Sequence, residues 1–208
     1  VEIATEALHR MGYEPEFKLI VWENKNKLLE DGEVDCIWGC FSMNGREDKY
    51  LWAGPYLYSR QMVAVRMDSE IQKLKDLTGK MIAVQETSKA EEYFLRSDFE
   101  GIPDVSLVYC FSNMDEVFAA LRKNYVEAIC GHESALISFI NTAPDEYRLL
   151  DESFLYSALG VAFDIQYDEE FVEELFKTLG DMMNDGTIAA IVGKYGLDAE
   201  KSLGRGND

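Results

Sequence analysis

Two polar residues, Ser42 and Arg46, lie four positions apart just after a short apolar run, and together they could bind a carboxylate. The arginine fork matches the two oxygens of a carboxylate, and a nearby hydroxyl can donate to the same group. Gly39, near the end of the apolar run 36–40, has no side chain and lets a small ligand approach the backbone. The alternative is a surface arginine paired with the acidic residues that follow it, which is a weak arrangement.

A nucleophile and a base for catalysis are harder to find. Cys40 with His132 would be the available pair, and Ser134 lacks the glycine-flanked turn of hydrolase serines. The two histidines, His9 and His132, are far apart in the sequence and show no metal-ligand spacing. We therefore expect no catalysis, no structural metal and no cofactor.

The composition is that of a globular protein, with 208 residues, 47% hydrophobic content and a formal net charge of -19. A charge of this sign repels nucleic acid and anionic lipid headgroups, so we exclude both as primary partners. No apolar run approaches the roughly 20 residues that span a bilayer. No signal peptide is present, so we expect a mature, trimmed or cytosolic chain.

All four cysteines lie in or at the ends of apolar runs, and we expect them to be buried as small hydrophobic residues. Cys36 and Cys40 would be roughly 13 Å apart along one strand, which is too far for a disulfide bond.

Strand-like apolar runs alternate along the chain with segments of helical periodicity, as in an α/β protein. Strands are predicted over residues 16–22, 36–40, 57–66, 81–85, 105–110, 124–131, 147–150 and 154–163. Helices are predicted over residues 1–11, 24–29, 87–95, 113–123, 168–183 and 187–195. Thr87 or Ser88 is a natural N-cap for the third of these helices.

Residues 32–56 resemble the signature of the type II periplasmic solute-binding proteins, the amino-acid-binding family shared with glutamate-receptor ligand cores. The usual form is G-x-V-D, an apolar strand, a small residue, a serine or threonine, an arginine and, about nine residues later, Pro-Tyr. The matching residues are Gly32, Asp35, Gly39, Ser42, Arg46, Pro55 and Tyr56. The gap from Ser42 to Arg46 is one residue shorter than usual, so Arg46 is identified by its distance to Pro55.

The resemblance implies a two-lobed type II periplasmic-binding-protein fold, in which each lobe is a mostly parallel sheet flanked by helices. Lobe one would comprise residues 1–57 and 158–208, lobe two residues 62–152, and the hinges would lie at about 57–62 and 152–158. Family members have a strand before the first helix, so we expect lobe one to lack its first strand here. The strands at 16–22 and 36–40 would then each have an unpaired edge, with loosened packing around Ile20 and Ile37 as one consequence.

The resemblance also implies where a ligand binds. Trp22 would stack on the ligand, or alternatively pack under a helix. The turn at 87–89 would bind the ligand carboxylate, with Thr87 in place of the usual glycine and Lys89 in place of a hydroxyl, or it is a plain capped helix. The implied ligand-binding residues are Trp22, Gly39, Phe41, Ser42, Arg46, Ser88, Lys89, His132 and Glu133.

His132 lies where the family places an aspartate that holds the ligand's ammonium group. A neutral histidine cannot replace a carboxylate opposite a cation. Either Glu133 takes this role or the ligand is not a simple α-amino acid; alternatively His132 is merely the neighbour of a helix N-cap.

The implied function is the binding of a small zwitterion such as an amino acid outside the cytoplasm, with closure of the two lobes around it. The protein would act as the substrate-binding component of an ABC transporter, with the permease as partner and a membrane tether in the full-length protein. The alternative is the extracellular sensor domain of a histidine kinase or diguanylate cyclase. A few members of the fold are dehydratases.

Overall fold

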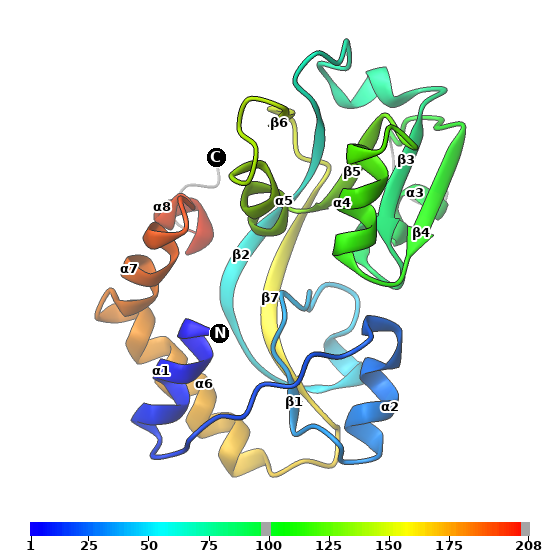
Figure 1. The fold of residues 1–208 in the computed structure, drawn as a ribbon. Helices are drawn as coiled ribbons and strands as arrows, with labels where there is room; N and C mark the ends of the chain where they lie inside the picture. Colours follow the sequence, from blue (N-terminus) through cyan, green and yellow to red (C-terminus); the bar gives the residue numbers. More distant parts are fainter. Residues whose placement is uncertain (97–100, 205–208) are drawn as a thin grey trace. The chain divides into compact units, whose positions relative to one another are not determined.

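The structure is a computed structural model and describes residues 1–96 and 101–204. It divides into two compact units. Unit 1 comprises Val1–Ile20, Asn24–Ser59 and Ser157–Asp208, and unit 2 comprises Val21–Glu23 and Arg60–Tyr156. Two strands pass from one unit into the other, β2 (Leu51–Arg66, cyan in Figure 1) and β7 (Leu155–Phe163, yellow).

Unit 1 holds the two-residue strand β1 (Cys36–Ile37), which pairs antiparallel with β7 and places Cys36 opposite Phe163. Strand β7 lies next to β2 in the sheet order. The helices of unit 1 are α1 (Glu2–Arg10), α2 (Lys25–Glu30), α6 (Glu169–Asn184), α7 (Thr187–Lys194) and α8 (Ala199–Ser202). The 3-10 turns η1 (Trp22–Asn24) and η2 (Glu47–Lys49) precede α2 and β2.

Helix α6 shows why these elements form. Asp168 caps it by accepting a hydrogen bond from the Glu170 amide (3.0 Å), and acidic side chains in the first turn favour the positive end of the helix. Four apolar residues on one stripe are buried, Val172, Leu175, Leu179 and Met182. This stripe packs into one core with residues of α1, α7, β2 and β7.

Unit 2 is built on the sheet order β2-β5-β3-β4, with β6 also paired to β2. Its strands are β3 (Met81–Gln85), β4 (Leu107–Phe111), β5 (Ala128–His132) and β6 (Tyr147–Leu149). Strand β3 runs parallel to β4 and β5, whereas β2 runs antiparallel to β5 and β6. The helices are α3 (Lys89–Leu95), α4 (Met114–Arg122) and α5 (Glu133–Ile140), with the 3-10 turn η3 (Leu74–Leu77).

Side chains alternate between the two faces of this sheet, as the pleat requires. One face packs against Tyr93 and Phe94 of α3 through Val63, Val65, Ile82, Val84 and Cys130. The other packs against α4 and α5 through Met62, Ala64, Ala83 and Ile129. The predicted α/β class with sheets flanked by helices is therefore confirmed.

The predicted strand at 16–22 is wrong. Of the described residues, 14–21 form neither helix nor strand, and Trp22 starts η1 and groups with unit 2. The apolar side chains of this stretch are open to solvent, with Phe17 51%, Leu19 100% and Val21 53% exposed. An alternating pattern produces a strand only where a neighbouring strand pairs with its backbone groups, and the structure records no such pairing here.

Two further predictions need correction. The predicted strand 36–40 is shorter than expected: β1 ends at Ile37, and Cys40 adopts a left-handed backbone (φ 53°) outside the β region. Ile37 is nevertheless only 4% exposed, so packing around it is not loosened. Cys110 is exposed rather than buried, because β4 ends the sheet order as an edge strand.

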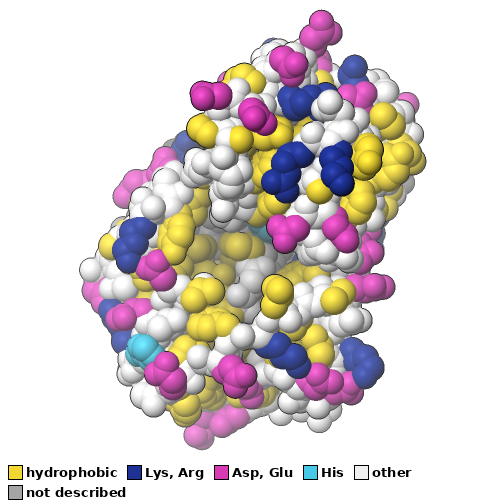
Figure 2. Space-filling model, in the orientation of Figure 1, with side chains coloured by type: hydrophobic (Ala, Val, Ile, Leu, Met, Phe, Trp, Pro, Cys, Tyr) yellow, Lys and Arg dark blue, Asp and Glu magenta, His cyan; other side chains and the backbone are white. Residues whose placement is uncertain are grey.

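Surface charge is dispersed. Figure 2 shows Asp and Glu side chains spread over the visible face and interspersed with Lys and Arg. Within the described part of the chain, no helix has the length and apolar character needed to cross a bilayer.

Candidate ligand-binding site

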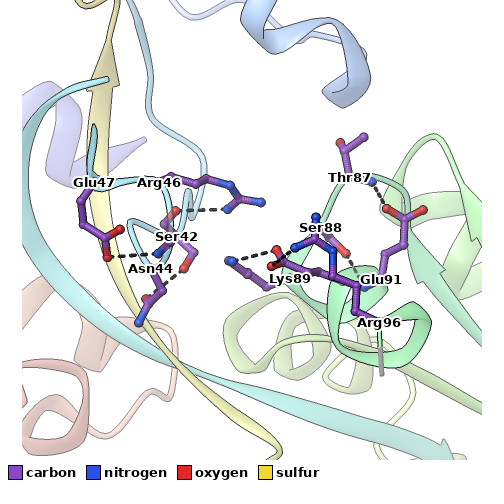
Figure 3. Close-up of polar contacts among 11 residues, drawn as sticks. Ser42, Asn44, Arg46, Glu47, Thr87, Ser88, Lys89, Glu91 and Arg96 are labelled. Carbon is purple, nitrogen blue, oxygen red and sulfur yellow. Dashed lines mark hydrogen bonds and ion pairs between the residues drawn. The ribbon is translucent and has the colours of Figure 1, made fainter. Parts of the chain in front are cut away.

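Unit 1 fixes Arg46 in the loop between β1 and β2. The guanidinium donates from Nη1 to the Ser42 carbonyl (3.1 Å), and the Arg46 amide donates to the Met43 carbonyl (2.9 Å). Figure 3 shows Arg46 extending from the same loop as Ser42, Asn44 and Glu47. The first bond ties the guanidinium to the loop, and the second fixes the backbone from which the side chain extends.

An aromatic cluster beneath this loop supports the arginine. Phe41 is 1% exposed and packs 5.3 Å, centroid to centroid, from both Tyr50 and Trp52. The Arg46 guanidinium lies 5.1 Å from the Phe41 ring centre, and the Trp52 indole nitrogen donates to the Arg46 carbonyl (3.2 Å). Phe41, whose predicted contact with the ligand stays a prediction, packs inside the unit with its ring against the Arg46 guanidinium.

Sequence reasoning missed several residues of this support. Lys25 is only 5% exposed, and its ammonium lies 6.0 Å from the Phe41 ring centre. Tyr50 and Trp52 also went unnoticed, although alternate aromatic residues just before the Pro-Tyr pair were a usable signal. Together these side chains pack around Phe41 below the Arg46 loop.

Ser42 joins the loop to β7. The hydroxyl donates to Asn44 Oδ1 (3.0 Å), which also accepts from the Ala158 amide (2.9 Å), and Ser42 forms a β-bridge with Leu159. The side chain is 2% exposed. Gly39 is exposed at the start of the same loop.

Unit 2 presents a second polar group of residues after β3. The Glu91 amide donates to Ser88 Oγ (3.2 Å), which confirms Ser88 as the N-cap, and the Thr87 amide donates to Glu91 Oε2 (2.7 Å). Thr87 holds a left-handed backbone (φ 55°), which is costly for a β-branched residue and marks a constrained turn. Figure 3 shows Thr87, Ser88, Lys89 and Glu91 gathered at this turn.

Lys89 is only 7% exposed, and its ammonium donates to Glu92 Oε2 (2.7 Å). Glu92 Oε1 accepts a second bond from Arg96 (3.2 Å). Glu92 therefore pairs with two cations, Lys89 in the first turn of α3 and Arg96 at its C-terminal cap.

The end of β5 carries the other predicted residues of unit 2. The antiparallel register places Gln61 of β2 opposite His132, and the Gln61 amide nitrogen lies 3.0 Å from His132 Nδ1. Arg60 binds both oxygens of Glu133, with Nε donating to Oε2 (3.0 Å) and Nη2 donating to Oε1. The pair is mostly buried, with side chains 22% and 19% exposed.

The structure thus places the predicted residues in three sets. Gly39, Phe41, Ser42 and Arg46 share one loop of unit 1. Ser88, Lys89, His132 and Glu133 follow two parallel strands of unit 2, and Trp22 lies in η1. Arg60 was missed, although it was a charged residue in an otherwise mostly apolar strand.

A surface hollow of about 460 Å³ lies elsewhere, on unit 1 against α1 and α7. Its lining includes Glu2, Thr187 and Lys194 and none of the predicted ligand-binding residues. This hollow is therefore distinct from the predicted ligand-binding residues.

Comparisons with known proteins agree with this description. Residues 1–198 match the family model of the bacterial extracellular solute-binding proteins, family 3. The chain is 24% identical to the L-cystine-binding protein TcyA of Bacillus subtilis (strain 168), over 97% of this chain and 73% of that protein. It is 27% identical to the glutamate-binding protein GluB of Corynebacterium efficiens, over 78% of this chain and 56% of that protein.

Among solved structures, the crystal structure of Tv2483 bound to L-arginine superposes with a TM-score of 0.81 and 27% identity. The superposition covers 93% of this chain and 79% of that chain. The ligands in these names are a disulfide-linked, an acidic and a basic amino acid, so the names agree on amino acids and differ in side-chain charge.

Proposed function

The chain belongs to family 3 of the bacterial extracellular solute-binding proteins, and on that premise we propose that it binds an amino acid outside the cytoplasm for an ABC transporter. The transporter permease is its partner, and a membrane tether holds the full-length protein at the cell surface. The chain acts by binding and carries out no catalysis.

The observation that carries this proposal is the fixed position of Arg46. An amino acid always presents an α-carboxylate, and a guanidinium held by its own loop and by an aromatic base is pre-organised to bind one. The relatives whose names state a ligand are named for amino acids. A sensor domain would use the same chemistry, and no feature of the described residues favours that role over transport.

Titration calorimetry of the Arg46→Ala variant against the twenty amino acids tests the proposal. Losing a charge-assisted contact costs about 1.5–3 kcal/mol, which weakens binding roughly tenfold to a hundredfold. Arg66→Ala is the matched control, because Arg66 lies at the far end of β2, opposite Tyr147, and should leave affinity unchanged. If Arg46→Ala binds as tightly as the parent, Arg46 is a surface residue and the proposal fails.

Closure of the units around the ligand stays a prediction. Small-angle X-ray scattering with and without the bound amino acid measures it, and a decrease in the radius of gyration is the expected result.

A further inference from the structure

Strand β4 is the outermost strand of the unit 2 sheet. It pairs with β3 along its full length on one side, and the sheet order ends there. On its other side no strand of residues 1–96 or 101–204 pairs with it, and Figure 1 shows this side at the margin of the unit. A free strand edge presents unpaired N–H and C=O groups that another strand can bind.

The edge of β4 lacks the features with which proteins usually protect such an edge, which are charged side chains, proline or a very short strand. Strand β6 of the same unit has them, because it is three residues long and its Arg148 donates to the Ser69 carbonyl (2.9 Å). Strand β4 has five residues, and residues 105–114 contain neither a charged residue nor a proline. The edge of β4 is therefore open to a partner strand.

The side chains of β4 are accessible as well. Leu107 is 46% and Tyr109 40% exposed, and Cys110 is also exposed. The rings of Tyr109 and Phe111 stack with their centres 6.4 Å apart. Figure 2 shows hydrophobic side chains gathered at this margin of the visible face. A partner strand would thus find apolar side chains beside the free backbone.

The backbone groups of two residues face the open side. The Phe111 carbonyl accepts a hydrogen bond from the Glu86 amide (2.9 Å), so Phe111 directs its backbone towards β3. Successive residues of a strand direct their N–H and C=O groups to opposite sides. Val108 and Cys110 therefore direct theirs to the open side.

The sequence of this edge is symmetric about Tyr109. The seven residues S-L-V-Y-C-F-S repeat the same residue classes in both directions. Two antiparallel copies centred on Tyr109 would pair like with like: Ser106 with Ser112, Leu107 with Phe111, and Val108 with Cys110.

This register also suits the backbone and the charges. The open groups of Val108 and Cys110 would form hydrogen-bonded pairs, and the two Tyr109 residues would be the closer, non-hydrogen-bonded pair. The nearest charged residues along the chain, Asp104 and Asp115, lie outside the paired stretch, so no like charges are opposed within it.

From this we infer that β4 is an interface between two copies of this chain, joined antiparallel across a twofold axis at Tyr109. A five-residue edge covers much less than the roughly 1,200–2,000 Å² of a stable interface. Two chains of net charge -19 also repel each other. The dimer is therefore weak and forms at high protein concentration. It involves no ligand, so the inference is independent of the proposed function.

Sedimentation velocity of the full chain, from micromolar to millimolar protein in high salt, tests the inference, because salt screens the repulsion. We expect the mass to rise from 23.7 kDa towards twice that value. The Tyr109→Lys variant should stay monomeric, because two lysines would oppose each other at the axis. A parent that is monomeric at every concentration, or a Tyr109→Lys variant that dimerises as the parent does, overturns the inference.

Tyr125→Lys is the matched control. It makes the same exchange at a tyrosine that is 63% exposed in the same unit but lies outside any strand. It should dimerise as the parent does, because it changes the net charge equally and leaves the edge of β4 unchanged. An equal loss of dimer in both lysine variants overturns the inference, because charge and not the strand edge would then control association.

Disulfide trapping tests the register with a smaller substitution. Opposed residues of a non-hydrogen-bonded pair have Cα atoms roughly 4.5 Å apart, which a disulfide bond can join. In a Cys110→Ser background, Tyr109→Cys should therefore form a covalent dimer under copper phenanthroline and air, seen on a non-reducing gel. Tyr109 belongs to none of the buried core clusters, so this exchange leaves the core intact. Tyr125→Cys in the same background is the control, and an equal dimer band from it, or no band from Tyr109→Cys, overturns the inference.

Discussion

Substitution of Gly160 in β7 should disturb its packing against Trp52 of β2, and through Trp52 the position of Arg46. A Cβ atom built on Gly160 lies 2.7 Å from Trp52 Cε3 and 2.8 Å from Met43 Sδ, both closer than real side chains approach. Met43 is flexible and can move. Trp52 is fixed by its bond to the Arg46 carbonyl and by packing on Phe41, so the Gly160→Ala variant must displace it.

Overpacking of this kind costs about 1–3 kcal/mol of the free energy of unfolding. For a chain of this size, that lowers the melting temperature by roughly 2 to 12 °C. Gly180→Ala is the matched control, because Gly180 lies in α6 with nothing within 4 Å of its added Cβ. Alanine there should instead stabilise the protein by about 0.5–1 kcal/mol.

Urea denaturation followed by tryptophan fluorescence measures the free energy of unfolding of both variants. Calorimetry with the bound amino acid measures their ligand affinity, which reports the effect on Arg46. We expect Gly160→Ala to lose stability and ligand affinity together. A Gly160→Ala variant as stable as the parent would show that Trp52 is free to move. A destabilised variant with unchanged affinity would show that Trp52 does not position Arg46.

Three further predictions follow from single residues. Trp22→Ala should weaken amino-acid binding without lowering the melting temperature of the ligand-free protein; a lower temperature would assign Trp22 to packing. Asp185, whose pKa is lowered to about 2 by its bonds to Thr187 and Arg10, stabilises the fold above the unfolded-state pKa near 4. Asp185→Asn should therefore lower the melting temperature slightly at pH 7, and the difference should vanish as the pH falls towards 2; a pH-independent difference would contradict this. Cys110 should react slowly with iodoacetamide at pH 7 despite its exposure, because its raised pKa leaves little thiolate, and mass spectrometry would reveal rapid labelling if this is wrong.

Local pattern was sufficient to predict much of the fold. The helices predicted at 168–183 and 87–95 appear as α6 and α3, and Ser88 caps α3 as one of the two predicted candidates. The strand predicted at 16–22 is absent because local sequence indicates only that a segment could be a strand. Whether it becomes one depends on a partner strand from elsewhere in the chain.

The site residues show the same limit. Arg46 was found from its spacing to Pro55, but its support by Trp52 depends on how the loop folds back on β2. The engagement of Glu133 by Arg60 depends on the antiparallel register of β2 and β5, which joins positions 73 residues apart. No local pattern reports such a register, so the role of Glu133 was left open by the sequence.

The open stretch around Phe17, Leu19 and Val21 should be where a protease first cuts this chain. Proteases bind substrates as extended segments, and this one combines free backbone with large accessible side chains. A cut there would separate α1 covalently from α2. Helix α1 would still be held by the bonds from Arg10 to Asp185 and from Lys194 to Glu2, so the nicked protein should stay folded and retain both fragments.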